Sequence, residues 1–167
     1  MASTNDTHQE NSFASQFETS LLKGTLVKRY KRFFAEVILA NGEVITAHNP
    51  NTGKMTGCAE PGFTAWVQPN NNPKRKLKFT LELVQNKNEE WIGVNTQRAN
   101  SIVSDALKLG LINEIDDIAS ITPEVKYGAE NSKIDFLITH NDGAQTYLYV
   151  KSVTLKDPQS SRGYFPD

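Results

Sequence analysis

The spacing of apolar residues changes once along this chain, from every second residue to every third or fourth. The stretch KLKFTLELV (residues 76–84) alternates polar and apolar positions, which is typical of a strand with one buried face. The later segment TQRANSIVSDALKLG (residues 96–110) places its apolar residues on one face of a helix. This change predicts a β-rich unit over residues 21–88 and a mixed α/β unit over residues 89–167, after a polar flexible tail at residues 1–20.

The β-rich unit contains several short runs of apolar and β-branched residues. GTLVKRY, FFAEVIL and FTAWVQ each have strand character, and Asn41-Gly42 lies between two such runs, where it is a strong hairpin signal. A loop rich in glycine and proline, NPNTGKMTGCAEPG, follows the hairpin. Five or so short strands in roughly seventy residues predict a small β-barrel or sandwich.

The second unit has a helix followed by a hairpin. Asn95 or Thr96 can cap the start of the helix, and Gly110 suits its end. A further short helix is expected around residues 112–121. The runs IDFLIT and TYLYVKSVTL flank the turn HNDGAQ and predict two antiparallel strands. The overall fold class expected is therefore mixed α+β.

The composition points to a cytoplasmic protein without a membrane segment. No run of 18 or more apolar residues is present, and the first twenty residues lack the basic start and apolar core of a signal peptide. A single cysteine, Cys58, allows no internal disulfide and is compatible with a reducing compartment.

The net charge of −1 conceals a basic segment. Residues 20–80 carry ten Lys and Arg against three acidic residues, whereas residues 81–167 carry eight against thirteen. The basic residues form two clusters, one of which, KRYKRF, is interleaved with aromatic residues. Cations neutralise phosphates and aromatic rings stack on unpaired bases, so the clusters predict a surface that binds nucleic acid without reading its sequence. The alternative is a solvated strand edge protected by charge. The predicted DNA contacts are Lys28, Arg29, Lys31, Arg32, Lys74, Arg75 and Lys76.

The predicted hairpin carries Asp135 in its first strand and Lys151 in its second. A carboxylate and a lysine on one face of a hairpin can hold Mg²⁺ beside a phosphate and stabilise negative charge. A two-residue turn would put the two side chains on opposite faces, whereas a three-residue loop over residues 141–143 would keep them on one face. From charges and strands alone, a structural Asp–Lys pair is the favoured account.

Several strings in the chain resemble the bacterial and archaeal sugar fermentation stimulation protein A (SfsA) family. These strings are LVKRYKRFFAEV, PNTGKMTGCAEPG, GVNTQRAN, EVKYGAENSKIDF and VKSVTL with GYFPD, and the likeness extends from Leu21 to the last residue. The resemblance implies an N-terminal OB-like barrel and an α/β domain similar to the PD-(D/E)xK nucleases. It also implies a cytoplasmic, non-specific DNA-binding protein with a regulatory role in sugar (maltose) metabolism.

By position, the resemblance assigns Asp135 and Lys151 to the nuclease motif and makes Asp135 and Glu124 the metal ligands for Mg²⁺. The family pattern has glutamate two residues before the lysine, where this chain has Tyr149. A neutral phenol is a poor Mg²⁺ ligand, so DNA binding is the expected function and Mg²⁺-dependent DNA hydrolysis the alternative. Family members continue beyond GYFPD, so we expect a nuclease-like domain that is truncated at its C-terminus.

Overall fold

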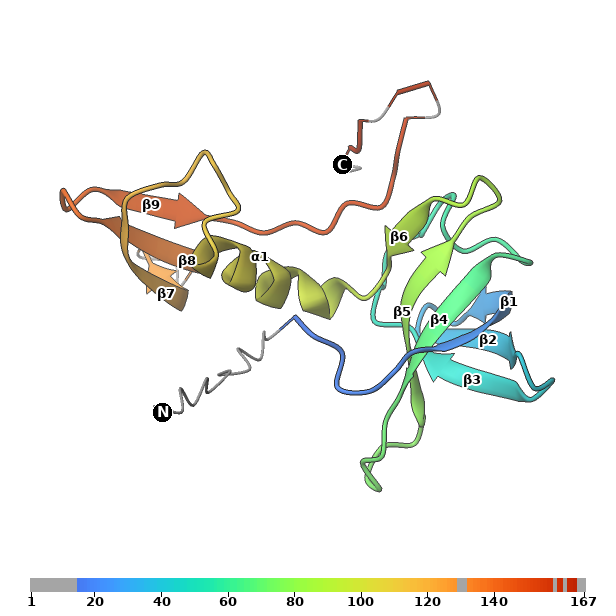
Figure 1. The fold of residues 1–167 in the computed structure, drawn as a ribbon. Coiled ribbons are helices and arrows are strands. Elements are labelled where there is room, and N and C mark those ends of the chain that lie inside the picture. Colours follow the sequence, from blue (N-terminus) through green and yellow to red (C-terminus); the bar gives the residue numbers. More distant parts are fainter. Residues whose placement is uncertain (1–14, 129–131, 158, 161, 165–167) are drawn as a thin grey trace, which may run out of the picture.

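The computed structural model of this chain describes residues 15–128, 132–157, 159–160 and 162–164. Its N-terminal unit is a sheet of six strands in the order β3-β2-β1-β4-β5-β6 (Figure 1). Parallel pairing between β3 and β5 closes the first five strands into a barrel, whose strand connections are those of an OB-fold. The strands are β1 (Leu22–Tyr30), β2 (Phe34–Leu39), β3 (Val44–His48), β4 (Thr64–Pro69), β5 (Phe79–Gln85) and β6 (Trp91–Gly93). The predicted OB-like barrel is confirmed.

Local sequence signals explain much of this barrel. The β2–β3 hairpin turns at Asn41-Gly42 as predicted, and Gly42 has a φ of 85°, which a residue with a side chain rarely adopts. A Cβ atom at Gly24 would lie 2.6 Å from the carbonyl oxygen of Ile38, so glycine is needed where β1 passes β2. The last strand, β6, pairs with β5 and lies beyond residue 88, the predicted domain boundary.

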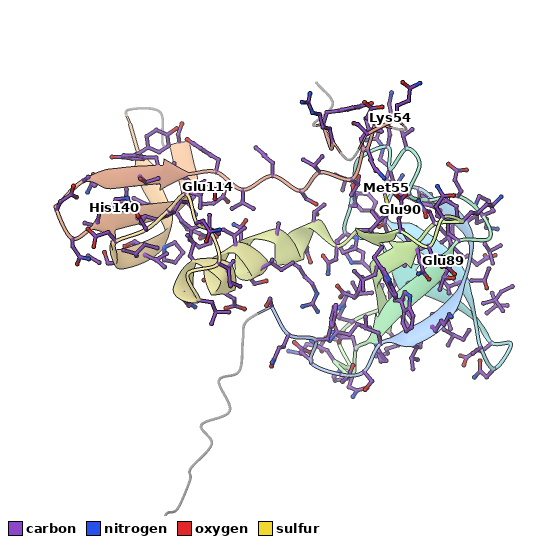
Figure 2. All side chains as sticks on the ribbon, turned by 45° about the horizontal axis from the view of Figure 1, so that its top comes forward. Lys54, Met55, Glu89, Glu90, Glu114 and His140 are labelled. Atoms are coloured by element: carbon purple, nitrogen blue, oxygen red, sulfur yellow. The ribbon has the colours of Figure 1, made fainter. Side chains whose placement is uncertain are left out.

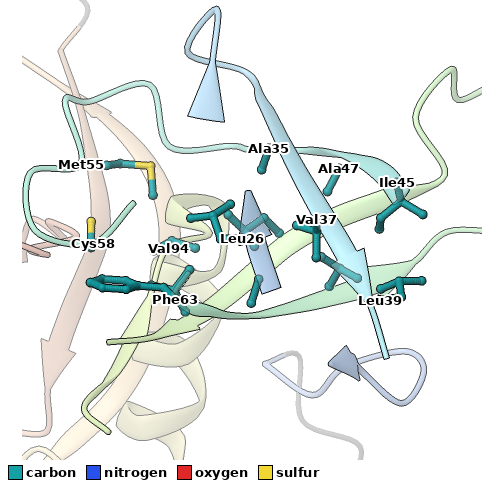
Figure 3. Close-up of a cluster of buried hydrophobic side chains, with 14 residues drawn as sticks. Leu26, Ala35, Val37, Leu39, Ile45, Ala47, Met55, Cys58, Phe63 and Val94 are labelled. Atoms are coloured by element: carbon teal, nitrogen blue, oxygen red, sulfur yellow. The ribbon is translucent and has the colours of Figure 1, made fainter. Parts of the chain in front are cut away.

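The barrel core is made by the inward-facing residues of its strands (Figure 3). Leu26, Val37 and Val67 are almost completely buried at its centre. The long β3–β4 loop adds Met55 and Cys58, both also buried. Burial raises the pKa of the Cys58 thiol. Trp91 lies outside this core: it is 57% exposed, and its ring lies against Trp66 at a centroid distance of 5.4 Å.

The second unit is a three-stranded antiparallel sheet packed on one helix. Leu107 and Val103 of the helix contact Phe136 and Ile138 of the central strand. The elements are η1 (Thr96–Arg98), α1 (Ala99–Lys108), β7 (Ile118–Tyr127), β8 (Ser132–His140) and β9 (Gln145–Leu148).

The helix boundaries follow the sequence signals, but the next element does not. The side chain of Asn95 accepts a hydrogen bond from Gln97 N at the start of η1, and Gly110 follows α1 with a φ of 65°. The short helix expected around residues 112–121 is wrong, because β7 begins at Ile118 and pairs with β8 along its length. The β-branched residues of this segment gain more from packing in a sheet than from a helical turn.

Arg98 joins the two units and part of the N-terminal segment. Its guanidinium lies 2.6 Å from the buried carboxylate of Glu82 and donates to the backbone carbonyl oxygen of Ser15, 3.2 Å away. The same group stacks over the ring of Phe17 at 4.2 Å. Residues 15–17 of the predicted tail therefore contact the folded units, whereas residues 1–14 lie outside the described residues.

The chain returns to the barrel after β9. The segment that follows β9 runs back beside α1 toward β6 (Figure 1). Near its end Lys156 forms an ion pair with Glu90 of the β5–β6 turn, and this hydrogen bond lowers the pKa of the Glu90 carboxyl group. Among the described residues, no helix has the length and apolar character needed to cross a membrane.

Candidate functional site

The first basic cluster is divided between a strand and a turn. The sequence places KRYKRF on a predicted strand, but β1 ends at Tyr30 and the next three residues form the β1–β2 turn. Lys31 and Arg32 have φ angles of 47° and 62°, in the left-handed region that costs a residue with a side chain about 1–2 kcal/mol. Phe33, the last residue of the turn, is 47% exposed. This turn therefore presents two cations and an aromatic ring to solvent.

Arg29 supports the β1–β2 turn through hydrogen bonds to backbone carbonyl groups. Its Nη2 donates to the carbonyl oxygens of Arg32 (3.0 Å), Asn51 (2.9 Å) and Gly53 (2.8 Å). Its Nε is buried and has no hydrogen-bond partner among the residues that the structure describes, and burial lowers the pKa of the guanidinium. Arg29 is one of the predicted DNA contacts, but its hydrogen bonds point toward the protein's own backbone, which favours a supporting role.

Asn49 holds the same turn from the end of β3. Its side chain is fully buried, and its Nδ2 donates to the carbonyl oxygens of Arg32 and Asn51, each 3.0 Å away. The backbone N–H of Asn49 donates to the carbonyl oxygen of Phe33 at 2.7 Å. One fully buried polar side chain, Asn49, and one partly buried side chain, Arg29, thus fix one strained turn, a role that the residue types alone did not reveal.

The second basic cluster lies in the β4–β5 loop, which projects from the barrel (Figure 1). Asn70 and Asn72 each accept a hydrogen bond from the backbone two residues later, which shapes the loop that carries Lys74 and Lys76. Arg75 donates to the Thr80 hydroxyl at 3.2 Å.

The β1–β2 turn and the β4–β5 loop leave the barrel at opposite ends, and the end of β3 lies between them. His48 pairs with Phe34, next to the turn, and with Thr80, the residue to which Arg75 donates. Because Arg75 donates to Thr80 and Thr80 pairs with His48, the guanidinium lies on the strand next to His48. Burial lowers the pKa of His48, and the positive charge of Arg75 lowers it further. The end of β3 therefore links the second basic cluster to Phe34, the residue that follows the β1–β2 turn.

The charges of the two clusters differ in how far they are neutralised. Lys28 on β1 forms an ion pair with Glu36 at 3.4 Å and lies 5.7 Å from the ring of Tyr30. Within the described part of the chain, no ion pair joins an acidic residue to Lys31, Arg32, Lys74 or Lys76. These four side chains leave both basic clusters with unneutralised positive charge.

The hairpin of β8 and β9 has the loop length and register for which residues 135 and 151 would face the same side of the sheet. Its loop is three residues long, since the N–H of His140 donates to the carbonyl oxygen of Ala144, and the last ladder pair is Phe136 with Leu148. The ladder stops there because the N–H of Val150 donates to Oδ2 of Asp135 at 2.8 Å. Lys151 therefore lies just beyond the strand, on the segment that returns to the barrel.

Asp135 binds two parts of its own chain. Besides Val150, its Oδ1 accepts a hydrogen bond from Nδ2 of Asn100, on α1, at 2.8 Å. Asn100 and Lys151 both line a cavity of about 550 Å³, together with Lys54 from the barrel's β3–β4 loop. Figure 2 shows Lys54 and Met55 on that loop, on the barrel side of the returning segment. The cavity lining contains no carboxylate among the described residues.

Glu124, the other predicted metal ligand, and Tyr149, which stands where the family pattern has glutamate, do not form a metal site with Asp135. Glu124 is exposed and forms an ion pair with Lys133 at 3.4 Å, and its φ of 54° departs from regular strand geometry. The hydroxyl groups of Tyr149 and Tyr127 share a hydrogen bond, which raises the pKa of Tyr149 to about 12 and keeps the phenol neutral at ordinary pH. No group of three His, Cys, Asp or Glu side chains gathers in the part of the chain that the structure describes. These donors do not fit Mg²⁺, which requires several charged or carbonyl oxygens in octahedral geometry.

Two family models cover most of the chain. The model of the SfsA N-terminal OB domain matches residues 27–94, and that of the sugar fermentation stimulation protein RE domain matches residues 97–167. Two curated proteins, each named sugar fermentation stimulation protein homolog, come from Pseudoalteromonas atlantica and Alteromonas mediterranea. The first is 53% identical over 152 residues and the second 49% identical over 156 residues. Both matches cover 91% of this chain, which spans 64% and 65% of the length of these relatives.

A solved structure has the same fold. It is described as Pyrococcus furiosus SfsA in complex with Ca²⁺, and it aligns with a TM-score of 0.69 at 19% sequence identity. The alignment covers 87% of this chain and 60% of that one.

Proposed function

We propose that this chain, which belongs to the sugar fermentation stimulation protein family, binds DNA without sequence preference through the two basic clusters of its barrel. The observation that carries this proposal is that the end of β3 lies between the two clusters: His48 pairs with Phe34, next to the β1–β2 turn, and with Thr80, to which Arg75 of the β4–β5 loop donates. OB-folds in general bind oligonucleotides with these two loops and the neighbouring face of β2 and β3.

The proposal gives the basic residues different roles. Lys31, Arg32, Lys74 and Lys76 contact phosphates, because no acidic residue in the described chain neutralises them. Lys28 and Arg75 contribute charge from positions already engaged with Glu36 and Thr80. Arg29 supports the turn. None of these contacts is to a base edge, so the binding is insensitive to sequence.

The test is DNA binding of the full chain as a function of salt. The triple variant Lys31→Ala, Lys74→Ala, Lys76→Ala is expected to bind all sequences more weakly and to lower the salt slope by about two to three. Lys87→Ala is the matched control, since it removes an exposed lysine from the β5–β6 turn, at the opposite end of β5. Binding that does not depend on salt, or equal losses in the triple variant and the control, would overturn the proposal.

We base the role that DNA binding has in the cell on the family to which the chain belongs. The relatives' name refers to sugar fermentation, and a cytoplasmic DNA-binding protein that regulates sugar (maltose) metabolism is the role that we propose for the whole protein. A buried thiol with no partner cysteine in the sequence is compatible with a reducing compartment.

The second candidate is a metal-dependent phosphodiesterase that uses Asp135 and Lys151. It is favoured by the three-residue hairpin loop, which gives the two residues the same parity, and by the complex with Ca²⁺ in which the Pyrococcus protein was solved. Glu124 and Tyr149 argue against it, because one is held in an exposed ion pair and the other is a neutral phenol. Incubation with DNA and Mg²⁺ decides between the two, because cleavage by the natural chain that Asp135→Ala abolishes would establish hydrolysis. Cleavage only by Tyr149→Glu would instead indicate a scaffold that lacks one carboxylate.

A further inference from the structure

The β1–β2 turn maintains an unfavourable backbone conformation. Two consecutive residues with side chains, Lys31 and Arg32, adopt positive φ angles. The same turn ends in Phe33, whose ring is exposed to water although the burial of apolar surface is favourable. A glycine at either strained position would relieve the backbone, and a polar residue in place of Phe33 would suit the solvent. The turn is therefore not arranged for stability alone.

Arg29 and Asn49 hold the turn with polar side chains that are partly or fully buried, and their burial lowers the stability of the fold. Arg29 is partly buried with an unsatisfied Nε, and Asn49 is fully buried with an unsatisfied Oδ1. An unpaired buried polar atom costs stability, yet both side chains direct hydrogen bonds to the carbonyl oxygen of Arg32. Their combined effect is to hold Lys31, Arg32 and Phe33 in one fixed orientation before any ligand arrives.

We infer that this preorganised turn binds an unpaired nucleic-acid strand, with the ring of Phe33 stacked on a base and Lys31 and Arg32 on the flanking phosphates. This inference rests on the proposed function and specifies the form of the nucleic acid. In a duplex each base face is covered by the neighbouring base pair, so the ring of Phe33 has no open base face on which to stack. In a single strand each base has an open face, and aromatic stacking adds to the attraction of the phosphates without requiring a particular sequence.

The β4–β5 loop extends the same path. Arg75 lies near His48, which pairs with Phe34, the residue after Phe33. A strand that stacks a base on Phe33 can therefore continue its backbone toward Lys74 and Lys76. On the other side of the turn, Tyr30 and Phe34 stack on each other at 5.3 Å, which leaves Phe33 as the exposed ring of this aromatic cluster.

The experiment compares a labelled oligothymidine of about 15 nucleotides with the same strand paired to oligoadenine, using fluorescence anisotropy and the full chain. Electrostatics alone favours the duplex, because its charge density is higher. Stacking on Phe33 reverses that order, so the single strand is expected to bind more tightly. Phe33→Ala is expected to weaken single-strand binding by at least about fivefold, to leave the salt slope unchanged and to affect the duplex little.

Further variants separate stacking from other effects. Phe33→Leu keeps apolar bulk without a flat ring and is expected to behave like Phe33→Ala. Phe33→Trp is expected to retain binding, and its added fluorescence should be quenched by the single strand. Val44→Ala is the matched control, because it removes an exposed apolar residue (61% exposed) from the opposite end of the β2–β3 hairpin.

Each outcome has a distinct meaning. If both probes bind with the duplex preferred, and Phe33→Ala changes neither affinity, this inference is wrong while the proposed DNA-binding function stands. Full retention of single-strand binding in Phe33→Leu would also overturn it, since hydrophobic contact would then suffice. If neither probe binds the natural chain, both proposals fail.

Discussion

The guanidinium of Arg29 donates a hydrogen bond to the carbonyl oxygen of Arg32, 3.0 Å away, across the turn that ends β1. A basic residue of the first cluster thus supports the backbone of another. The cluster contains one arginine that positions the turn and neighbouring cations that the turn exposes. Substitutions at the two arginines should therefore have different consequences for stability and for DNA binding.

Arg29→Lys is expected to destabilise the fold by about 2 kcal/mol, because lysine cannot reproduce several hydrogen bonds from one planar fork. The free energy of unfolding, measured with denaturant, tests this. DNA affinity should fall as well, since the turn loses its support, although the charge is retained. Lys28→Ala is the control: its ion pair with Glu36 is exposed, so little stability should be lost. Equal stability losses in the two variants would contradict the role given to Arg29.

Arg32→Gly is expected to stabilise the protein by about 0.5–1 kcal/mol, because glycine adopts a φ of 62° without strain. The same substitution should weaken DNA binding, since it removes a phosphate contact. Arg32→Ala should weaken binding to a similar degree without the gain in stability. Thermal unfolding and anisotropy of the two variants measure the opposing effects. An alanine variant as stable as the glycine variant would show that the turn is not strained.

Asp135→Ala is expected to lower the free energy of unfolding by about 1–3 kcal/mol, because it leaves the N–H of Val150 and the amide of Asn100 without their acceptor. Asp135→Asn keeps one acceptor oxygen and should lose less. Denaturant unfolding of both variants, without added metal, measures this structural role separately from any hydrolysis. An asparagine variant as unstable as the alanine variant would mean that one remaining acceptor oxygen contributes nothing to stability, which would contradict the additive role given to the two hydrogen bonds.

Tyr127→Phe is expected to lower the pKa of Tyr149 from about 12 toward its ordinary value near 10, because the shared hydrogen bond is its main cause. The raised pKa favours the protonated phenol in the folded state. Its contribution to stability is therefore complete below about pH 10 and is lost as the pH rises through about 12. Tyrosinate absorbance or NMR titration measures the shift.

Tyr147→Phe is the control for this titration. Tyr147 contacts the ring of Tyr127, at a centroid distance of 5.9 Å, while its own hydroxyl donates to Gln145. Removing that hydroxyl should leave the pKa of Tyr149 unchanged. A fall as large as that in Tyr127→Phe would assign the shift to the general surroundings of the tyrosines rather than to one hydrogen bond.

Local signals in the sequence determined the elements whose causes are local. Asn41-Gly42 predicted the β2–β3 hairpin, because few residue pairs adopt its turn geometry. The helical spacing predicted α1, which ends before Gly110, and Asn95, one of the two predicted caps, caps η1, the short helix that leads into α1. The basic character of residues 20–80 was also evident from the residues alone, whereas the departure at Tyr149 was evident only against the pattern of the family that the chain resembles.

The tertiary structure decided everything that depends on which strands meet. Parallel pairing of β3 with β5 places His48 next to Thr80, the partner of Arg75, and so puts the end of β3 between two clusters that local sequence leaves independent. The partners of Asp135 are Asn100 and Val150, which lie 35 and 15 residues away. Segment 118–127 is a strand because β8 offers it a partner, although its apolar residues are also compatible with a helix. Barrel closure and sheet pairing are long-range contacts, whose free energy comes from the whole assembled core and not from any short window of residues.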